Sequence, residues 1–149
     1  METKVSIDLG TDTIRNYQQA GLIASQCHAG AYVNRFVVVV DDDIGGPFPP
    51  GPSDYAQRAL GPEFIGRYSG GSRVVLVFAE PRAWKGRSGL GSASHEALAH
   101  HASAADLVVL FGHPRLLSEI PGKAPVLLAW HRQRLMQEAV ARWLRGRLG

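Results

Sequence analysis

Four short runs of apolar, mostly β-branched residues constrain the fold more than any other feature of the sequence. They are FVVVV at 36–40, VVLVFA at 74–79, LVVLF at 107–111 and PVLLAW at 125–130. Continuous apolar runs of this length are typical of strands buried on both faces, as in a parallel sheet covered by helices. With helical patterns between them, they predict an α/β fold: a single three-layer sandwich with a largely parallel, Rossmann- or flavodoxin-like sheet and right-handed crossovers.

The segments between the runs predict mostly helices. We expect helices at 12–26, 53–60, 92–104, 114–119 and 132–148, with Ser53 as a helix cap and 114–119 as a single turn. Two weaker strand candidates lie at 5–9 and 64–68. The last helix should be amphipathic, and its expected inward side chains are Leu135, Met136, Ala139, Val140, Trp143 and Leu144.

The length of 149 residues predicts one domain over 1–149, in which 1–35 is a lead-in region that contains the first helix. A chain of this length is too short for a (β/α)8 barrel, which needs roughly 200 residues or more. Cys27 is the only cysteine, and neither a signal peptide nor a membrane-spanning run is visible, which favours a cytoplasmic protein without a membrane partner. The net charge is +3, and 131–149 holds five arginines and one glutamate. Such a basic helix is more often a solvated face than a nucleic-acid site.

The ends of the predicted strands point to a site. In an open parallel α/β sheet, ligands bind outside the carboxyl ends of the strands. Each strong strand of this chain ends in polar or aromatic residues, which core packing does not require. We therefore predict that ligand-binding residues at this edge come from the following set: Asp41, Asp42, Asp43, Glu80, Arg82, Trp84, Lys85, Arg87, His113 and His131.

Each of these residues also has a structural explanation. The three aspartates either accept hydrogen bonds from a ligand, or cap a turn and pair with arginines. The basic residues that follow Glu80 either grip a carboxylate or phosphate, or pair with those aspartates. Trp84 either stacks on a sugar or base or covers the sheet edge, and His113 either contacts ligand or fixes its loop. The sequence leaves these alternatives open.

Known cofactor and metal motifs do not account for this edge. Gly86, Gly89 and Gly91 give GxxGxG rather than the dinucleotide pattern GxGxxG, and they lie too far from their strand for a tight phosphate turn. No HExxH, HxH or CxxC spacing predicts a metal site. The run VVVVDDD is similar to the acidic pocket of response-regulator receivers, but those need a lysine at a late strand end, where this chain has His113 and His131. We therefore predict no cofactor and no metal.

Several stretches together resemble one known family. FVVVVDDDIGGPFPPGP, VFAEPRAWKGRSGL, ADLVVLFGHPRL and APVLLAWHRQRLMQEAVARWLRGRL are similar, in this order, to the C-terminal α/β sandwich domain of glycoside hydrolase family 3, and most closely to bacterial β-N-acetylhexosaminidase-like members. The resemblance covers 36–149. The FGHP step after a strand and the closing helix are its most specific parts.

The resemblance implies a retaining hydrolase whose catalytic aspartate and His–Asp acid/base belong to a (β/α)8 barrel that precedes this domain. We therefore assign no catalytic residue; Glu80 is the only candidate at a strand end, and no motif match supports it. The chain is expected to be an accessory or carbohydrate-contacting module, inactive alone, whose partner is such a barrel or a carbohydrate. The alternative is a stand-alone Rossmann-like domain that binds a small sugar or an anionic ligand.

Overall fold

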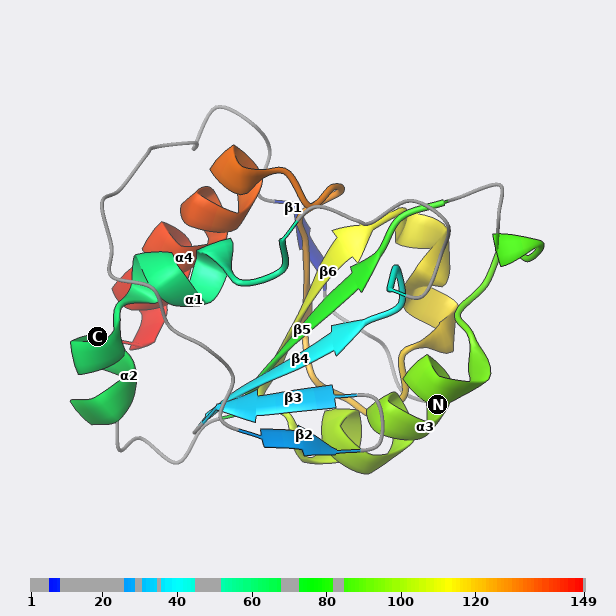
Figure 1. Ribbon diagram of the computed structural model, residues 1–149, viewed down its shortest axis with the longest axis horizontal. Coiled ribbons are helices and arrows are strands. Elements are labelled where there is room, and N and C mark those ends of the chain that lie inside the picture. Colours follow the sequence, from blue (N-terminus) through cyan, green and yellow to red (C-terminus); the bar gives the residue numbers. More distant parts are fainter. Residues whose placement is uncertain are drawn as a thin grey trace.

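The computed structural model describes residues 36–44, 52–67, 73–81 and 85–148, together with the backbone of three short strands at 6–8, 26–28 and 31–34. Within these ranges one sheet of seven strands has the order β1-β7-β6-β5-β4-β3-β2 (Figure 1). The strands are β1 (Ser6–Asp8), β2 (Gln26–His28), β3 (Ala31–Asn34), β4 (Val37–Asp41), β5 (Val74–Ala79), β6 (Leu107–Gly112) and β7 (Val126–Leu128).

The centre of the sheet is parallel, as predicted. β4, β5, β6 and β7 pair side by side in parallel, and β1 adds a further parallel strand beyond β7. At the other edge β2 and β3 form an antiparallel hairpin, and β3 is antiparallel to β4. All four apolar runs therefore form adjacent parallel strands, so their carboxyl ends meet at one edge.

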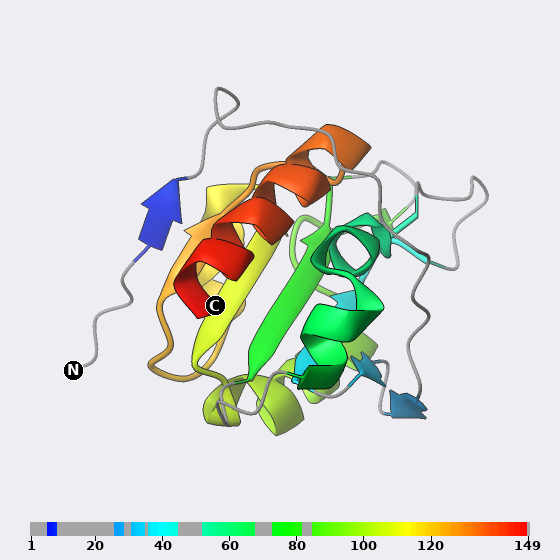
Figure 2. The ribbon, with the colours of Figure 1, turned by 90° about the vertical axis from the view of Figure 1, so that its left-hand side faces the viewer.

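Helices cover both faces of the sheet and make the three layers expected from the sequence. The helical segments are α1 (Tyr55–Leu60), α2 (Pro62–Arg67), α3 (Ser92–His101), η2 (Ala102–Ala104), η3 (Pro114–Glu119) and α4 (Arg134–Leu148). Figure 2 shows α1, α2 and α4 over one face, while α3 and η3 lie on the other. None of the helices in the described ranges is long and apolar enough to cross a bilayer.

The alternation of side chains along each strand divides the core in two. Val37 and Val39 pack on the face that carries α1 and α4, whereas Val38 and Val40 pack on the face that carries α3. All four are at most 2% exposed. A strand buried on both faces needs apolar residues at every position, which explains the unbroken valine run.

The connections between the parallel strands do not all have the same hand. β4 to β5, β5 to β6 and β6 to β7 each step across the sheet in one direction. However, α1 and α2 lie on one face, while α3 and η3 lie on the other. Equal steps on opposite faces have opposite hands, so the expectation that every crossover is right-handed is wrong. The first connection, residues 42–73, is long and is held on its face by packing of α1 against α4.

Several predicted elements need correction. Residues 64–67 of the strand expected at 64–68 belong to helix α2, which begins at Pro62 and has Glu63 in its first turn, both favourable at a helix start. Asp54, not Ser53, occupies the N-cap position of α1. The helix expected at 12–26 falls mostly on 9–25, outside the described residues, but Gln26 belongs to β2. We did not predict the β2–β3 hairpin.

Helix α4 presents most of its expected inward face to the core. Met136, Val140 and Leu144 are fully buried, but Leu135 is 43% exposed and Trp143 is only partly buried against the core. Gln137 is fully buried instead of Leu135. Its amide nitrogen donates to the carbonyl oxygens of Pro52 and Arg132, and its amide oxygen accepts from the N–H of Ala56. The helical periodicity of apolar residues alone could not predict that Gln137 is buried and hydrogen-bonded.

Candidate functional site

Asp41, Asp42 and Asp43 form a buried turn at the carboxyl end of β4. The N–H of Asp42 donates to the carbonyl oxygen of Phe78 on β5 at 2.8 Å, which keeps the chain beside its neighbouring strand. The N–H of Asp43 donates to the Asp41 carboxylate at 3.0 Å. The three residues are only 7%, 7% and 1% exposed. Buried carboxylates need cationic or hydrogen-bonding partners.

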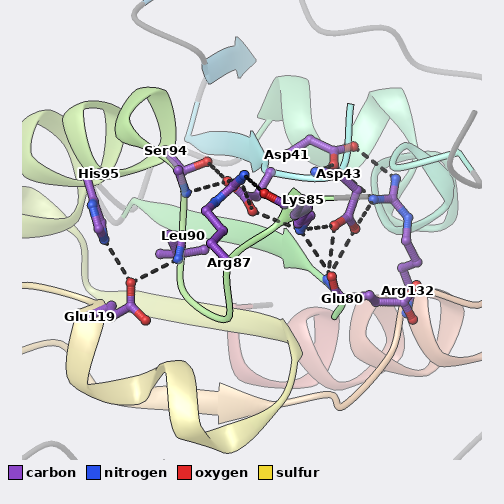
Figure 3. A network of polar contacts seen from close by, with 12 residues as sticks. Asp41, Asp43, Glu80, Lys85, Arg87, Leu90, Ser94, His95, Glu119 and Arg132 are labelled. Carbon is purple, nitrogen blue, oxygen red and sulfur yellow. Dashed lines mark hydrogen bonds and ion pairs between the residues drawn. The ribbon is translucent and has the colours of Figure 1, made fainter. Parts of the chain in front are cut away.

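Arg132 is the partner of two of these carboxylates (Figure 3). Its two terminal nitrogens each lie 2.9 Å from an oxygen of Asp41, and Nη1 also lies 2.7 Å from Oδ2 of Asp43. The guanidinium packs over the ring of Phe78, 4.9 Å from its centroid. Burial alone would lower the pKa of Arg132, but Asp41 and Asp43 raise it above its ordinary value. The side chain is therefore a permanent cation inside the sheet edge.

Lys85 bridges the other two carboxylates. Its Nζ lies 2.8 Å from Asp42 and 2.7 Å from Asp43, and it donates to the carbonyl oxygen of Glu80 at 3.0 Å. The N–H of Glu80 donates to Asp43 at 3.0 Å. The Lys85 side chain is 4% exposed. The loop after β5 is thus fixed to the turn after β4 by ionic hydrogen bonds, which are stronger than neutral ones.

Asp42 accepts hydrogen bonds from more groups than Asp41 or Asp43 does. Besides Lys85, it accepts from Arg87 at 3.0 Å, from the Ser94 hydroxyl at 2.6 Å and from the N–H of Gly91 at 2.9 Å. Burial alone would raise the pKa of Asp42, but the hydrogen bonds from Lys85, Ser94 and Gly91 lower it below its ordinary value of 3.8. Asp42 therefore holds the start of α3 against the sheet as an anion.

These six side chains form what we call the ion-pair cluster: Asp41, Asp42, Asp43, Lys85, Arg87 and Arg132. Of the two explanations left open by the sequence, pairing between aspartates and basic residues is confirmed for the aspartates, Lys85 and Arg87. A role of the same residues in ligand binding stays a prediction. Chemically, the cluster is a set of carboxylates that are ion-paired with fixed cations.

The glycines after Lys85 allow the loop to pack closely. A Cβ at Gly91 would lie 2.7 Å from Nη2 of Arg87, and a Cβ at Gly89 would lie 2.7 Å from the Glu119 carboxylate. Glu119 accepts from the N–H of Leu90 at 2.9 Å and contacts His95 at 2.9 Å. Gly89 and Gly91 therefore leave room for the side chains of Glu119 and Arg87.

The two candidate histidines are placed beside helix starts. Nδ1 of His113 accepts from the N–H of Arg115, so His113 caps η3, which is the loop-fixing alternative. Nδ1 of His131 accepts from the N–H of Gln133 at 3.3 Å, just before α4. Oε2 of Glu80 accepts from the N–H of Arg132 at 3.3 Å. The remaining candidates, Arg82 and Trp84, lie outside the described residues.

Arg132 and Ser94 complete the edge but were not selected from the sequence. Arg132 directly follows a predicted strand end, so its position was a usable signal; three aspartates at a neighbouring strand end need a cation of this kind. Ser94 lies inside a predicted helix, and nothing in the local pattern indicates that it contacts Asp42 across 52 residues.

The cavity beside the cluster is very small. It has a volume of about 10 Å³ and lies among Asp42, Glu80, Lys85, Arg87 and His113, with other residues of the two loops. A volume of about 10–15 Å³ holds one water molecule. This cavity is therefore too small for a sugar ring.

The low pKa of Asp42 predicts acid sensitivity. Because the folded-state pKa lies below the unfolded value, the stabilisation by ionised Asp42 is complete above about pH 4 and is lost as pH falls through the lower folded value. We expect the free energy of unfolding, measured with urea between pH 6 and pH 2, to fall steeply below about pH 4. In Asp42→Asn the decline should be shallower; an unchanged slope would show that Asp42 is not held in this way.

Comparison of the chain with models of protein families, with curated proteins and with solved structures finds no match. The resemblance to family 3 therefore depends on the sequence segments themselves.

Proposed function

We propose that this chain is the C-terminal α/β domain of a family 3 glycoside hydrolase of the β-N-acetylhexosaminidase or β-glucosidase type, acting as an accessory to a separate catalytic barrel. Two lines support the proposal. The segments that resemble the family occur in the family's order, and the fold is the three-layer, mostly parallel sandwich that the resemblance implies. A cytoplasmic location, favoured by the single cysteine, is part of the same proposal.

The observation that carries the accessory role is the state of the carboxylates at the sheet edge. A retaining glycosidase needs two carboxyl groups about 5–5.5 Å apart, one of them kept protonated by a raised pKa. Here Arg132 lies between Asp41 and Asp43, and Lys85 lies between Asp42 and Asp43. Each of these carboxylates is therefore ion-paired with a cation from another strand end. Such pairing supports a fixed, structural edge in the described part of the chain.

Exposed apolar residues favour a partner surface at the same edge. In the described ranges the large hydrophobic side chains that are exposed are Ile44 at 50%, Trp130 at 44% and Leu135 at 43%. Ile44 follows the aspartate turn, Trp130 follows β7, and Leu135 lies in the first turn of α4, so each is near a carboxyl end of the sheet. Contiguous apolar surface marks sites that a partner covers, and these three residues are the large apolar groups that a partner at this edge would contact.

The first test is the activity of the chain alone. We expect the purified chain to show no hydrolysis of aryl β-N-acetylglucosaminides or aryl β-glucosides above the buffer background. The reason is that the family's nucleophile belongs to the barrel and that half a site forfeits most of the benefit of orientation.

The matched control is the Asp42→Asn, Glu80→Gln double variant, assayed at the same concentration. Equal background rates for both proteins are the expected result. Hydrolysis by the wild type that the double variant loses would contradict the accessory role, because it would place a complete site at this edge. The other candidate is a stand-alone Rossmann-like binder of a small sugar or anionic ligand at the same edge, which saturable binding of such a ligand by the chain alone would favour.

A further inference from the structure

A groove lies between α2 and the C-terminal part of α4, on the face of the sheet that these helices cover (Figure 1). Its volume is about 280 Å³, close to the lower limit of roughly 300 Å³ for pockets that bind small molecules. Leu60, Pro62 and Phe64 supply its apolar walls. Phe64 packs edge-on against Phe36, which directly precedes β4. The groove is therefore near the amino end of β4, whereas the ion-pair cluster lies at its carboxyl end.

Two exposed arginines line this groove from different helices. Arg145, on α4, is held in place, because its Nη1 donates to the carbonyl oxygen of Leu60 and its guanidinium packs 4.8 Å from the ring centroid of Phe64. Arg67, at the end of α2, donates from Nε to the carbonyl oxygen of Glu63 at 3.3 Å. Within the described residues, Nη2 of Arg145 and both Nη groups of Arg67 make no further hydrogen bond, so they can donate to a ligand.

The charges along the groove favour an anion, and its geometry favours a phosphate. Its charged lining residues are Arg67, Arg145 and Glu63, two positive and one negative, which gives a net charge of +1. One guanidinium can satisfy both oxygens of a planar carboxylate. The three terminal oxygens of a phosphate monoester point in different directions, which suits two guanidiniums that come from two helices. The apolar walls leave room for the organic group that the phosphate esterifies.

We propose that this groove binds a small phosphate monoester. Arg67 and Arg145 bind the phosphate oxygens, and the organic group lies against Leu60, Pro62 and Phe64. The site goes beyond the accessory role proposed above and does not depend on it, because its residues belong neither to the ion-pair cluster nor to the carboxyl edge of the sheet. A failed test of this site therefore leaves the accessory role standing.

The test is a calorimetric titration of the whole chain with phenyl phosphate at pH 7 and about 0.15 M ionic strength, where charges more than about 8 Å away are largely screened. We expect saturable binding, with inorganic phosphate weaker by about tenfold because it has no apolar group to bury. Arg145→Gln should raise the dissociation constant of phenyl phosphate by at least about tenfold, the usual effect of losing a hydrogen bond to a charged group. Glu63→Gln should lower it, because a like charge is removed from the groove.

Two further variants separate a specific site from general charge. Arg142→Gln is the matched control, because it removes the same charge three residues earlier on α4 and does not line the groove; it should bind as the wild type does. Arg67→Gln repeats the test on an exposed side chain and leaves the contacts of Arg145 intact, so it should also weaken binding. The absence of saturable binding by the wild type, or unchanged binding in Arg67→Gln, would overturn the site. So would equal losses in Arg142→Gln and Arg145→Gln together with tighter binding of a single-stranded oligonucleotide, which would assign the face to nucleic acid instead.

Discussion

Arg132→Met is expected to destabilise the protein by about 3–5 kcal/mol, the usual cost of removing one partner of a buried ion pair. Methionine keeps much of the side-chain volume, so the loss comes mainly from charge. Without the guanidinium, Asp41 loses both of its cationic hydrogen bonds and Asp43 loses one, while both remain buried. The measurement is urea unfolding at pH 7, with the slope of the transition checked for two-state behaviour.

Two further variants identify the cause. Arg58→Met removes an exposed i,i+4 pair with Asp54 and should change stability by less than about 1 kcal/mol. The Asp41→Asn, Arg132→Met double variant should be less destabilised than the sum of the two single variants, because it removes the stranded charge of Asp41 together with its cation. Strictly additive effects, or a loss below about 1 kcal/mol in Arg132→Met, would contradict the buried ion-pair cluster.

Gly112→Ala is expected to destabilise the protein by about 3 kcal/mol, the upper end of the usual cost of overpacking. A Cβ at Gly112 would lie 2.3 Å from the carbonyl oxygen of Ala79. Gly112 pairs with Ala79 at the carboxyl end of β5 and β6, so the obstacle is backbone rather than a movable side chain. Relief requires the two strands to separate next to the loops that carry Glu80 and His113.

The same substitution elsewhere provides the control. A Cβ at Gly146, near the end of α4, meets no atom within 4 Å. Gly146→Ala should therefore stabilise the protein by up to about 1 kcal/mol, because alanine favours the helix. Thermal or urea unfolding of both variants measures the difference. A neutral Gly112→Ala would show that β5 and β6 do not approach as closely as described.

The parallel centre of the fold could be predicted because a strand buried on both faces needs an apolar residue at every position. Val37 to Val40 alternate between two cores, so every position is apolar. The hairpin of β2 and β3 is harder to predict, because QCH and AYVN are short and mixed in polarity; β3 pairs with β4, and β2 pairs with β3. Likewise 64–67 has a strand-like composition, but a helix that starts at Pro62 includes these residues.

The location of the candidate site could be predicted from the sequence. Whether its residues bind a ligand or pair with one another could not. The rule that parallel strands deliver ligand-binding residues to one edge correctly placed the aspartates, Glu80 and Lys85 together. The rule does not say whether they are open to a ligand or paired with one another, because that depends on side chains from other strand ends. Arg132 and Lys85 decide this through their contacts with the aspartates, which span between 42 and 91 residues of sequence. The positive φ of Trp130, +65°, is also invisible in the sequence, where tryptophan gives no signal for this conformation.

The accessory role is tested most directly by supplying this chain to a family 3 barrel that lacks its own C-terminal domain. The measured quantity is kcat/KM for an aryl β-N-acetylglucosaminide as the concentration of the chain is raised. We expect no turnover from the chain alone and an increase in the barrel's kcat/KM that saturates, as a binding partner requires. A barrel rate that does not change at any concentration of the chain would contradict the accessory role.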